Sequence, residues 1–358
     1  MGKSYRLSAD CIPVRGYQRC TVHDLSRQDV RCVSEFVYNT LINNDIINEQ
    51  MLPASDLREL IEHEIIFECP HDAVALFPRV QLEYCSPFKI ESCIVEIDCD
   101  IDFDCEQLIA EISTVGCKQL QIWAYDTVGG DIITSVLEHV AGKNILNTDL
   151  ILKFDSIDVH GIISSFPFIS SIVAYGAENM QVEEVAGCTI IHTPEPFAGC
   201  QQCGNVAPNQ FVCNREFFFL SASQNTCLYR KLSIDCEGYI RNCPASPQHF
   251  GRVGEVSLAE AMAHPDFSRL WGITKDQVDV CRHCEFRRIC PDCRVFTRQP
   301  ERPTAHPARC TYNPYIARWQ GQPGYVPVEQ CGTFTPEGFV PDAERIDRVL
   351  REQQQLKG

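Results

Sequence analysis

The feature that most constrains this 358-residue chain is a group of four cysteines between Cys281 and Cys293. Their spacing is C-x2-C-x5-C-x2-C, and Pro291 directly follows the third cysteine, Cys290. Thiols this close in sequence lie on tight turns that can direct their sulfur atoms to common points, and the proline disfavours a helix there. The spacing therefore predicts a metal or cluster site.

Three further cysteines flank this group. Cys227 and Cys243 precede it in a segment that reads C-x10-G-x4-C, with the glycine at Gly238, and Cys310 follows it. A zinc ribbon or a disulfide-rich module would also contain paired C-x2-C motifs. Four ligands saturate a zinc ion, so seven thiols argue against a single zinc site.

This pattern of seven cysteines closely resembles the SPASM domain, the auxiliary iron-sulfur module of radical SAM peptide-modifying enzymes. The sequence around the cysteines looks like the peptide maturase of grasp-with-spasm systems, which is encoded beside an ATP-grasp ligase and a ribosomally made precursor peptide. The segments that carry this second resemblance are 11–17, 225–235, 242–244 and 270–277. One departure is the C-x2-C spacing of Cys290 and Cys293, where the family usually has C-x3-C.

The resemblance implies two [4Fe-4S] clusters held by eight thiolates. The implied ligands of one cluster are Cys203, Cys227, Cys243 and Cys293, and those of the other are Cys281, Cys284, Cys290 and Cys310. Cys203 is included because the glycine after it lets backbone N–H groups approach its sulfur, and because the related maturases resemble this chain in a Cys-Gly pair. Clusters with four thiolates have no open iron, so they suit electron transfer, substrate positioning or structural support. If Cys293 does not cross to the first cluster, the four cysteines of the C-x2-C-x5-C-x2-C group would form a zinc site instead.

Strands and helices alternate through the middle of the sequence. We expect strands at 90–97, 119–125, 150–154 and 169–175, with helices between them that begin after Asp104 and at Ile132 and Val159. Such alternation predicts βα units with a parallel sheet. A radical SAM domain is a partial barrel of such units, so the position fits the resemblance.

The C-x3-C-x2-C motif that binds the reducing cluster in radical SAM enzymes is absent from this sequence. Cys93, Cys99 and Cys105 are separated by five residues each, and aspartates surround the last two. Carboxylates near an anionic thiolate cluster are unfavourable, so structural thiols are favoured there over an unusual cluster. We therefore expect a degenerate barrel that neither uses S-adenosylmethionine (SAM) as a cofactor nor cleaves it.

The first 85 residues predict a small α+β module. A strand near Cys11 precedes a hairpin over 19–33, two helices over 36–42 and 57–64, and a returning strand at 65–67. The arrangement resembles the winged-helix, PqqD-like element that holds leader peptides, in which the leader adds a strand to an exposed sheet edge. An N-terminal α+β cap without that role would show the same pattern.

Charge and hydropathy exclude some partners. The net charge of −17 argues against binding nucleic acid through a phosphate-neutralising surface. No run approaches the roughly 18 to 20 apolar residues of a membrane span, and the first residues lack the apolar region of a signal peptide. We therefore expect a cytoplasmic protein without membrane contact whose 22 cysteines are reduced.

The sequence thus predicts an α/β protein in four parts. These are a leader-recognition module at 1–85, a degenerate radical SAM-like βα domain at 86–195, a SPASM iron-sulfur domain at 196–335 and a C-terminal helix at 336–358. The favoured function is maturation of a ribosomally made precursor peptide together with an ATP-grasp ligase. Two alternatives stay open: a redox enzyme with a non-standard cluster, and a zinc- or cluster-stabilised scaffold without catalysis.

Several smaller expectations accompany this assignment. Ser257 and Glu260 predict a capping box, His283 could donate to a thiolate, and the segment after Cys310 reads as irregular surface coil. The helix from Glu344 to Leu356 reads as solvated or partner-facing. The roles of five cysteines stay open, one of which could form a zinc pair with Cys203: Cys99, Cys105, Cys200, Cys213 and Cys236.

Overall fold

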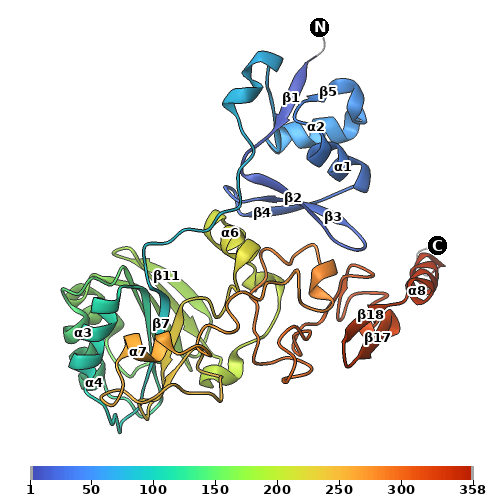
Figure 1. Cartoon of the computed structure of the whole chain (residues 1–358). Helices are drawn as coiled ribbons and strands as arrows, with labels where there is room; N and C mark the ends of the chain where they lie inside the picture. Colours follow the sequence, from blue (N-terminus) through green and yellow to red (C-terminus); the bar gives the residue numbers. More distant parts are fainter. Residues whose placement is uncertain (1–2, 356–358) are drawn as a thin grey trace. The chain divides into compact units, whose positions relative to one another are not determined.

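The computed structural model describes residues 3–355, and the chain forms two units that interleave along the sequence. The N/C unit comprises residues 1–84, 204–226 and 272–358, and the sheet unit comprises 85–203 and 227–271. Figure 1 labels their principal helices and strands. The segment from Cys281 to Cys310 and the N-terminal module therefore belong to the same unit.

The sheet unit is built on an eight-stranded sheet in the order β11-β12-β10-β9-β8-β7-β13-β14. All its inner pairings are parallel, and only the outer strands β11 and β14 run antiparallel to their neighbours. The bounds are β7 Ile90–Ile97, β8 Cys117–Ala124, β9 Asn147–Lys153, β10 Ile169–Tyr175, β11 Gln181–Val185, β12 Cys188–Thr193, β13 Lys231–Ile234 and β14 Ile240–Arg241. This large, mostly parallel sheet confirms the predicted α/β class.

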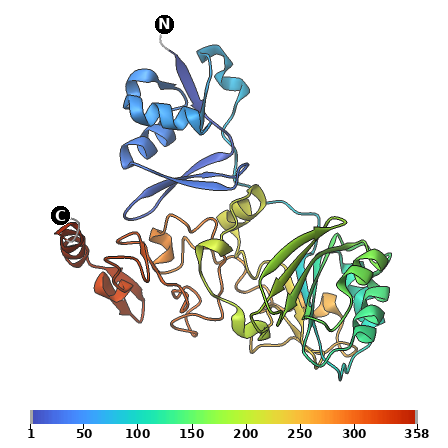
Figure 2. The same cartoon turned by 180° about the vertical axis from the view of Figure 1, so that it is seen from behind.

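Helices connect the parallel strands and cover one face of the sheet. They are α3 (Cys105–Val115), α4 (Gly130–Val140) and α5 (Val159–Ser165), and α7 (Leu258–Ala263) packs beside α3. Figures 1 and 2 show α3 and α4 on the same side of the sheet. The Asp104 side chain accepts a hydrogen bond from the Gln107 backbone, and Ser257 forms the predicted capping box with Glu260. These contacts fix where α3 and α7 begin.

Two features of this sheet were not predicted. The β11–β12 hairpin extends one edge, and β13 inserts next to β7 from within the cysteine-containing segment after Cys227. β13 has only four residues, and Leu232 and Ile234 are its buried apolar positions. So short an alternation does not stand out in sequence.

The N-terminal part of the N/C unit contains two small antiparallel sheets. One has the order β5-β1-β6 and the other is the β2-β3-β4 meander. The bounds are β1 Ser4–Leu7, β2 Cys11–Arg15, β3 Cys20–Asp24, β4 Asp29–Val33, α1 Glu35–Asn43, β5 Ile47–Asn48, α2 Ala54–Glu62 and β6 Ile66–Glu68. The hairpin, both helices and the returning strand are present as predicted, although α2 begins three residues earlier, directly after Pro53, and ends two residues earlier.

The C-terminal part of the N/C unit has its own apolar core. Its elements are β15 Tyr312–Asn313, β16 Arg318–Trp319, β17 Gly332–Thr335, β18 Gly338–Pro341 and α8 Ala343–Gln355. The helix α6 (Arg215–Ser223) instead buries Phe218 in a cluster with Val14 and Leu25. Tyr315, Ile346 and Val349 are buried in one cluster. The segment after Cys310 is therefore not only surface coil, and α8 is not solvated all round. The predicted end of that helix at Leu356 lies outside the described residues.

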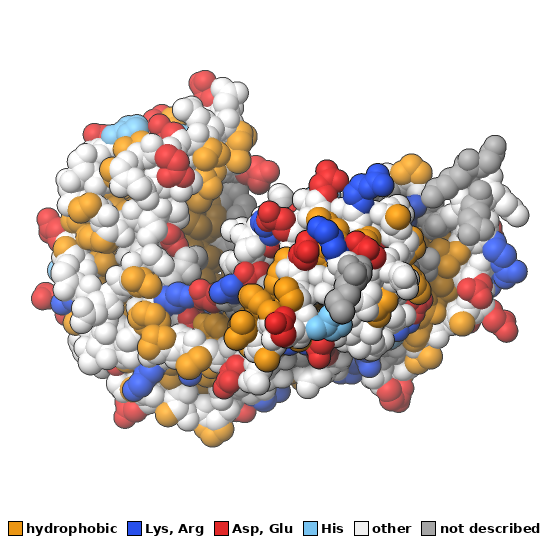
Figure 3. All heavy atoms as spheres, turned by 90° about the horizontal axis from the view of Figure 1, so that it is seen from above, with side chains coloured by type: hydrophobic (Ala, Val, Ile, Leu, Met, Phe, Trp, Pro, Cys, Tyr) orange, Lys and Arg blue, Asp and Glu red, His pale blue; other side chains and the backbone are white. Residues whose placement is uncertain are grey.

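Short 3-10 helices complete the secondary structure: η1 Glu49–Met51, η2 His71–Leu76, η3 Gly199–Gln202, η4 Pro208–Gln210, η5 Cys281–His283 and η6 Val328–Gln330. No helix among residues 3–355 combines the length and apolar character that crossing a bilayer requires. Acidic side chains are scattered over the face seen in Figure 3 rather than gathered into one patch.

Candidate functional site

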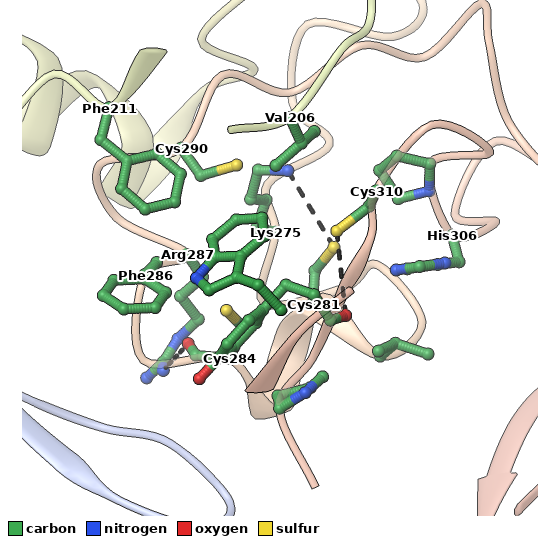
Figure 4. Close-up of a pocket in the computed structure, with 15 residues that line it drawn as sticks. Val206, Phe211, Lys275, Cys281, Cys284, Phe286, Arg287, Cys290, His306 and Cys310 are labelled. Atoms are coloured by element: carbon green, nitrogen blue, oxygen red, sulfur yellow. Dashed lines mark hydrogen bonds between the residues drawn. The ribbon is translucent and has the colours of Figure 1, made fainter. Parts of the chain in front are cut away.

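Four of the eight predicted ligand cysteines line one cavity in the N/C unit (Figure 4). They are Cys281, Cys284, Cys290 and Cys310, and all four are free thiols. Apolar side chains, among them Phe286, line the same cavity. The four cysteines that the resemblance implies as ligands of the second cluster therefore line the same cavity.

Tight turns position these thiols, as the spacing predicted. Cys281 begins η5, and the backbone N–H of Cys284 donates to the Cys281 carbonyl oxygen at 2.9 Å. Val280, directly before this turn, has φ of 63°. A β-branched residue rarely adopts this left-handed conformation, so the surrounding contacts must hold it there.

Burial makes these thiols poor acids. It raises the pKa of Cys290 to about 11 and that of Cys310 to about 12, and repulsion from Cys281 adds to both shifts. Burial also raises the pKa of Cys281, against the opposing effect of Lys275. Thiols that interact with one another in a desolvated site become thiolates only when a metal or another positive charge compensates them.

A positive charge is already present in this cavity. Lys275 is 5% exposed, and its Nζ lies 4.0 Å from Cys281 Sγ and 3.3 Å from Asp292 Oδ1. Burial opposes the charge of Lys275, but Asp292 and the thiols of Cys281 and Cys290 outweigh it and raise the lysine pKa. Figure 4 shows the ammonium directed toward the sulfur of Cys281. The sequence reasoning missed this residue, although it lies within the segment 270–277 that carries the resemblance.

The β2–β3 hairpin packs against the segment that carries Cys281 and Cys284. The fully buried carboxylate of Glu285 is ion-paired with Arg19 and accepts a hydrogen bond from the Tyr312 hydroxyl. His23 Nε2 lies 3.1 Å from the Glu285 carbonyl oxygen. The backbone N–H of Tyr17 donates to the His283 carbonyl oxygen at 2.7 Å. Residues far apart in sequence therefore support the thiol-bearing turn.

His283 does not contact a thiol through its Nδ1, contrary to what its position in the C-x2-C turn suggested. This nitrogen lies 2.9 Å from the Tyr315 hydroxyl oxygen. Burial lowers the pKa of His283, and the neighbouring Arg282 and Arg287 lower it further. The imidazole thus helps to fix the buried Tyr315.

In the sheet unit, a second lysine interacts electrostatically with three further predicted ligands. Lys231 Nζ donates to Cys227 Sγ at 3.5 Å. Burial disfavours its charge, but Cys227, Cys243 and Cys203 outweigh this effect and raise the lysine pKa. The fourth predicted ligand, Cys293, belongs to the N/C unit, where its sulfur accepts from the backbone N–H of Phe296 at 3.5 Å.

No group of three or more His, Cys, Asp or Glu side chains that could hold a metal ion is found among residues 3–355. The chemistry of the donor set in the N/C unit nevertheless fits a thiolate-ligated group, because four cysteines and a compensating ammonium share one cavity. Soft thiolate ligands select iron-sulfur clusters or zinc over hard cations.

The cysteines near the first parallel strand lie in different environments. Cys93 is fully buried in β7, Cys105 is half-buried at the start of α3, and Cys99 is exposed in the loop between them. Cys93 packs in the core of the sheet, which agrees with a structural role.

Two of the cysteines with open roles have identifiable neighbours. Cys213 is buried, and its sulfur lies within 3.6 Å of the carbonyl oxygens of Asp24 and Asp29. Burial raises the pKa of Cys236 to about 12, and Glu96 adds to that shift. Cys331 is also buried, and its sulfur accepts a hydrogen bond from Asn313.

A second group of polar and aromatic residues lies at the carboxyl ends of β7 and β8, the edge where parallel sheets commonly bind ligands. The Tyr125 hydroxyl donates to Glu96 at 2.8 Å, and burial raises the pKa of that carboxyl group. Phe197 stacks on Tyr125 with ring centroids 5.8 Å apart and meets Trp123 edge-on at 5.3 Å. Sequence patterns predicted the strands here but not this cluster, since Phe197 comes from a distant loop.

The fold and the site thus define an α/β protein with a buried, thiol-lined cavity. No protein-family model and no curated protein sequence matches the chain. Among solved structures, the chain is similar to SuiB of Streptococcus suis bound to S-adenosylmethionine, at 13% identity and a TM-score of 0.32. It is also similar to SuiB bound to the precursor peptide SuiA, at 12% identity and a TM-score of 0.33. The matches cover 84% and 85% of this chain, respectively, and 98% of SuiB in both. These TM-scores are too low to transfer residue roles.

Proposed function

We propose that this chain takes part in maturing a ribosomally made precursor peptide and carries two [4Fe-4S] clusters. The ligands of one cluster are Cys281, Cys284, Cys290 and Cys310, and those of the other are Cys203, Cys227, Cys243 and Cys293. The observation that carries the proposal is that the first four thiols line the same cavity as Lys275, whose ammonium contacts Cys281. Clusters ligated in this way would supply electron transfer or structural support.

The residues around the cavity suit this role. Asp292 is 2% exposed, accepts a hydrogen bond from Asn225 at 2.9 Å and pairs with Arg294 at 2.6 Å. Asp292 in turn holds Lys275 next to Cys281. A buried charge without such partners is costly, so this chain of contacts supports a site whose thiols become negatively charged.

The precursor peptide is proposed to bind at the N-terminal module. A groove of about 420 Å³ is lined by β1, β2, the end of α1 and the segment 76–82. Arg6 donates to the Phe77 carbonyl oxygen at 2.6 Å and Arg79 pairs with Asp45 at 3.1 Å, which holds this segment along the groove. Leu76 is 77% exposed there. Exposed apolar side chains beside short sheet edges suit a leader peptide that adds a strand.

An ATP-grasp ligase is the proposed protein partner, on the ground of the sequence resemblance. The absence of C-x3-C-x2-C is the ground for proposing that the chain does not cleave SAM. Incubating the anaerobically reduced protein with SAM and measuring 5′-deoxyadenosine tests this point. Formation of that product would favour the alternative of a redox enzyme with a non-standard cluster.

Iron, acid-labile sulfide and zinc assays on protein purified without oxygen test the proposal as a whole. We expect about eight irons and as many sulfides per chain, since each of two clusters contains four of each. About one or two zinc ions without sulfide would instead support a zinc-stabilised scaffold.

A further inference from the structure

The two groups of predicted ligands share a feature that their sequence motif does not explain. Each group contains one lysine whose ammonium lies next to a cysteine sulfur, Lys275 in the N/C unit and Lys231 in the sheet unit. We propose that these lysines are positioning residues that supply a fixed positive charge to the two iron-sulfur clusters and make each cluster easier to reduce. This inference rests on the proposed function, because it requires that the thiols hold clusters.

Lys275 is placed as a component of its site. Its side chain lines the same cavity as Cys281, Cys284, Cys290 and Cys310 and is nearly inaccessible to solvent. The nearby carboxylate of Asp292 is itself held by Asn225 and Arg294. The ammonium therefore has a defined position instead of the many positions open to a surface lysine.

Lys231 reaches the same arrangement from a different element. It begins β13, directly beside β7 in the parallel sheet, and its Nζ donates to Cys227 Sγ at 3.5 Å. The backbone carbonyl of Lys231 accepts a hydrogen bond from Asn242, the residue before Cys243, at 2.6 Å. Among residues 3–355, Lys231 forms no ion pair with a carboxylate, and its ammonium hydrogen-bonds to the Cys227 sulfur.

The physical consequence follows from charge. Reduction adds an electron to a cluster that four thiolates already make negative, and a nearby cation stabilises the more negative state. Net charge and hydrogen bonds to the sulfurs are among the factors that set cluster reduction potentials. A lysine in this position therefore raises the midpoint potential of the cluster that it faces.

The test uses the full-length chain, purified without oxygen, with the substitutions Lys275→Met and Lys231→Met. Lys275→Arg and Lys231→Arg keep the charge, and Lys153→Met is the matched control because Lys153 is half-exposed and pairs with Asp126. Iron and sulfide contents are measured first. Midpoint potentials are then obtained by redox titration followed by electron paramagnetic resonance.

We expect each methionine variant to make reduction of one cluster at least tenfold less favourable, a shift of about 59 mV to lower potential for one electron. The other cluster should keep its potential, and the arginine variants should recover most of the shift. If a methionine variant loses iron while its arginine counterpart keeps it, the need for the charge is also supported.

Wild-type protein without iron and sulfide would overturn the proposed function and this inference together. Wild-type protein with two clusters whose potentials do not change in either methionine variant would overturn the inference alone. Loss of iron from both the methionine and the arginine variant at one site would show that charge is not what the lysine supplies there.

Discussion

Arg19 forms an ion pair with Glu285, the residue that directly follows the predicted ligand Cys284. The pair joins the β2–β3 hairpin to the thiol-bearing turn across 266 positions of sequence. Glu285 is fully buried, whereas the Arg19 side chain is 30% exposed. The hairpin is therefore part of the support of the candidate site as well as part of the N-terminal module.

Substituting Arg19 with methionine should destabilise the protein strongly. The variant leaves the Glu285 carboxylate buried without its cation, which typically costs about 3 to 5 kcal/mol of unfolding free energy. Urea unfolding followed by circular dichroism measures the change. Arg15→Met is the control on the same hairpin, because Arg15 and its partner Glu35 are both more than half exposed. If both variants unfold at the same urea concentration, the Arg19–Glu285 pair does not stabilise the protein more than the exposed Arg15–Glu35 pair.

His23 should make stability depend on pH. Burial lowers its pKa to about 4, against about 6.5 in an unfolded chain. Between these values the unfolded state binds a proton that the folded state does not, so stability is full above pH 6.5 and decreases as the pH falls toward 4. The loss from this group is about 3 kcal/mol.

The His23→Gln variant isolates this effect. The difference in unfolding free energy between wild type and variant should shrink as the pH falls from 7 to 4, because only the wild type loses the contribution of His23. Denaturant unfolding at several pH values measures it. If the difference in unfolding free energy between wild type and variant does not change with pH, the pKa of His23 is not lowered in the folded protein.

Much of the fold was predictable because its signals are local. β7 and β10 have the bounds that their apolar runs predicted, and Asp104 caps α3 as expected. The short strand β13 and the buried face of α8 were not predicted, since each depends on where the rest of the chain packs. Local periodicity does not show which distant segments pack against a given strand or helix.

The candidate site also has a part that was predicted from the sequence and a part that was not. The family resemblance implied that Cys281, Cys284, Cys290 and Cys310 form one ligand set, and these four cysteines line one cavity in the structure. Lys275 could not be assigned from sequence, because a lysine near cysteines is usually a solvated surface residue. Its role depends on its burial beside Cys281 and Asp292, which only the tertiary structure specifies.

Leader recognition should depend on the apolar side chains of the groove. Leu76→Asp places a charge where an apolar side chain would be covered by bound peptide, so affinity for a labelled precursor peptide should fall at least about tenfold. Fluorescence anisotropy with the full-length protein measures it. Val182→Asp is the matched control, because Val182 is 59% exposed on β11 in the other unit. Equal losses in both variants would contradict a specific groove.

Removing one ligand should affect one cluster. Cys310→Ala should lower the iron content from about eight to about four per chain, because a four-thiolate cluster loses one of its ligands while the other keeps all four. Cys213→Ala, which removes a buried thiol that contacts backbone carbonyl groups, should keep all the iron. Unchanged iron in the Cys310 variant would remove this residue from the ligand set.

The most direct test of the account is the Mössbauer spectrum of the full-length protein prepared without oxygen from iron-57-enriched cells. We expect the quadrupole doublets of two [4Fe-4S] clusters, with about eight irons per chain. A protein without cluster iron, whose Cys281, Cys284, Cys290 and Cys310 instead bind zinc or form disulfides, would contradict it.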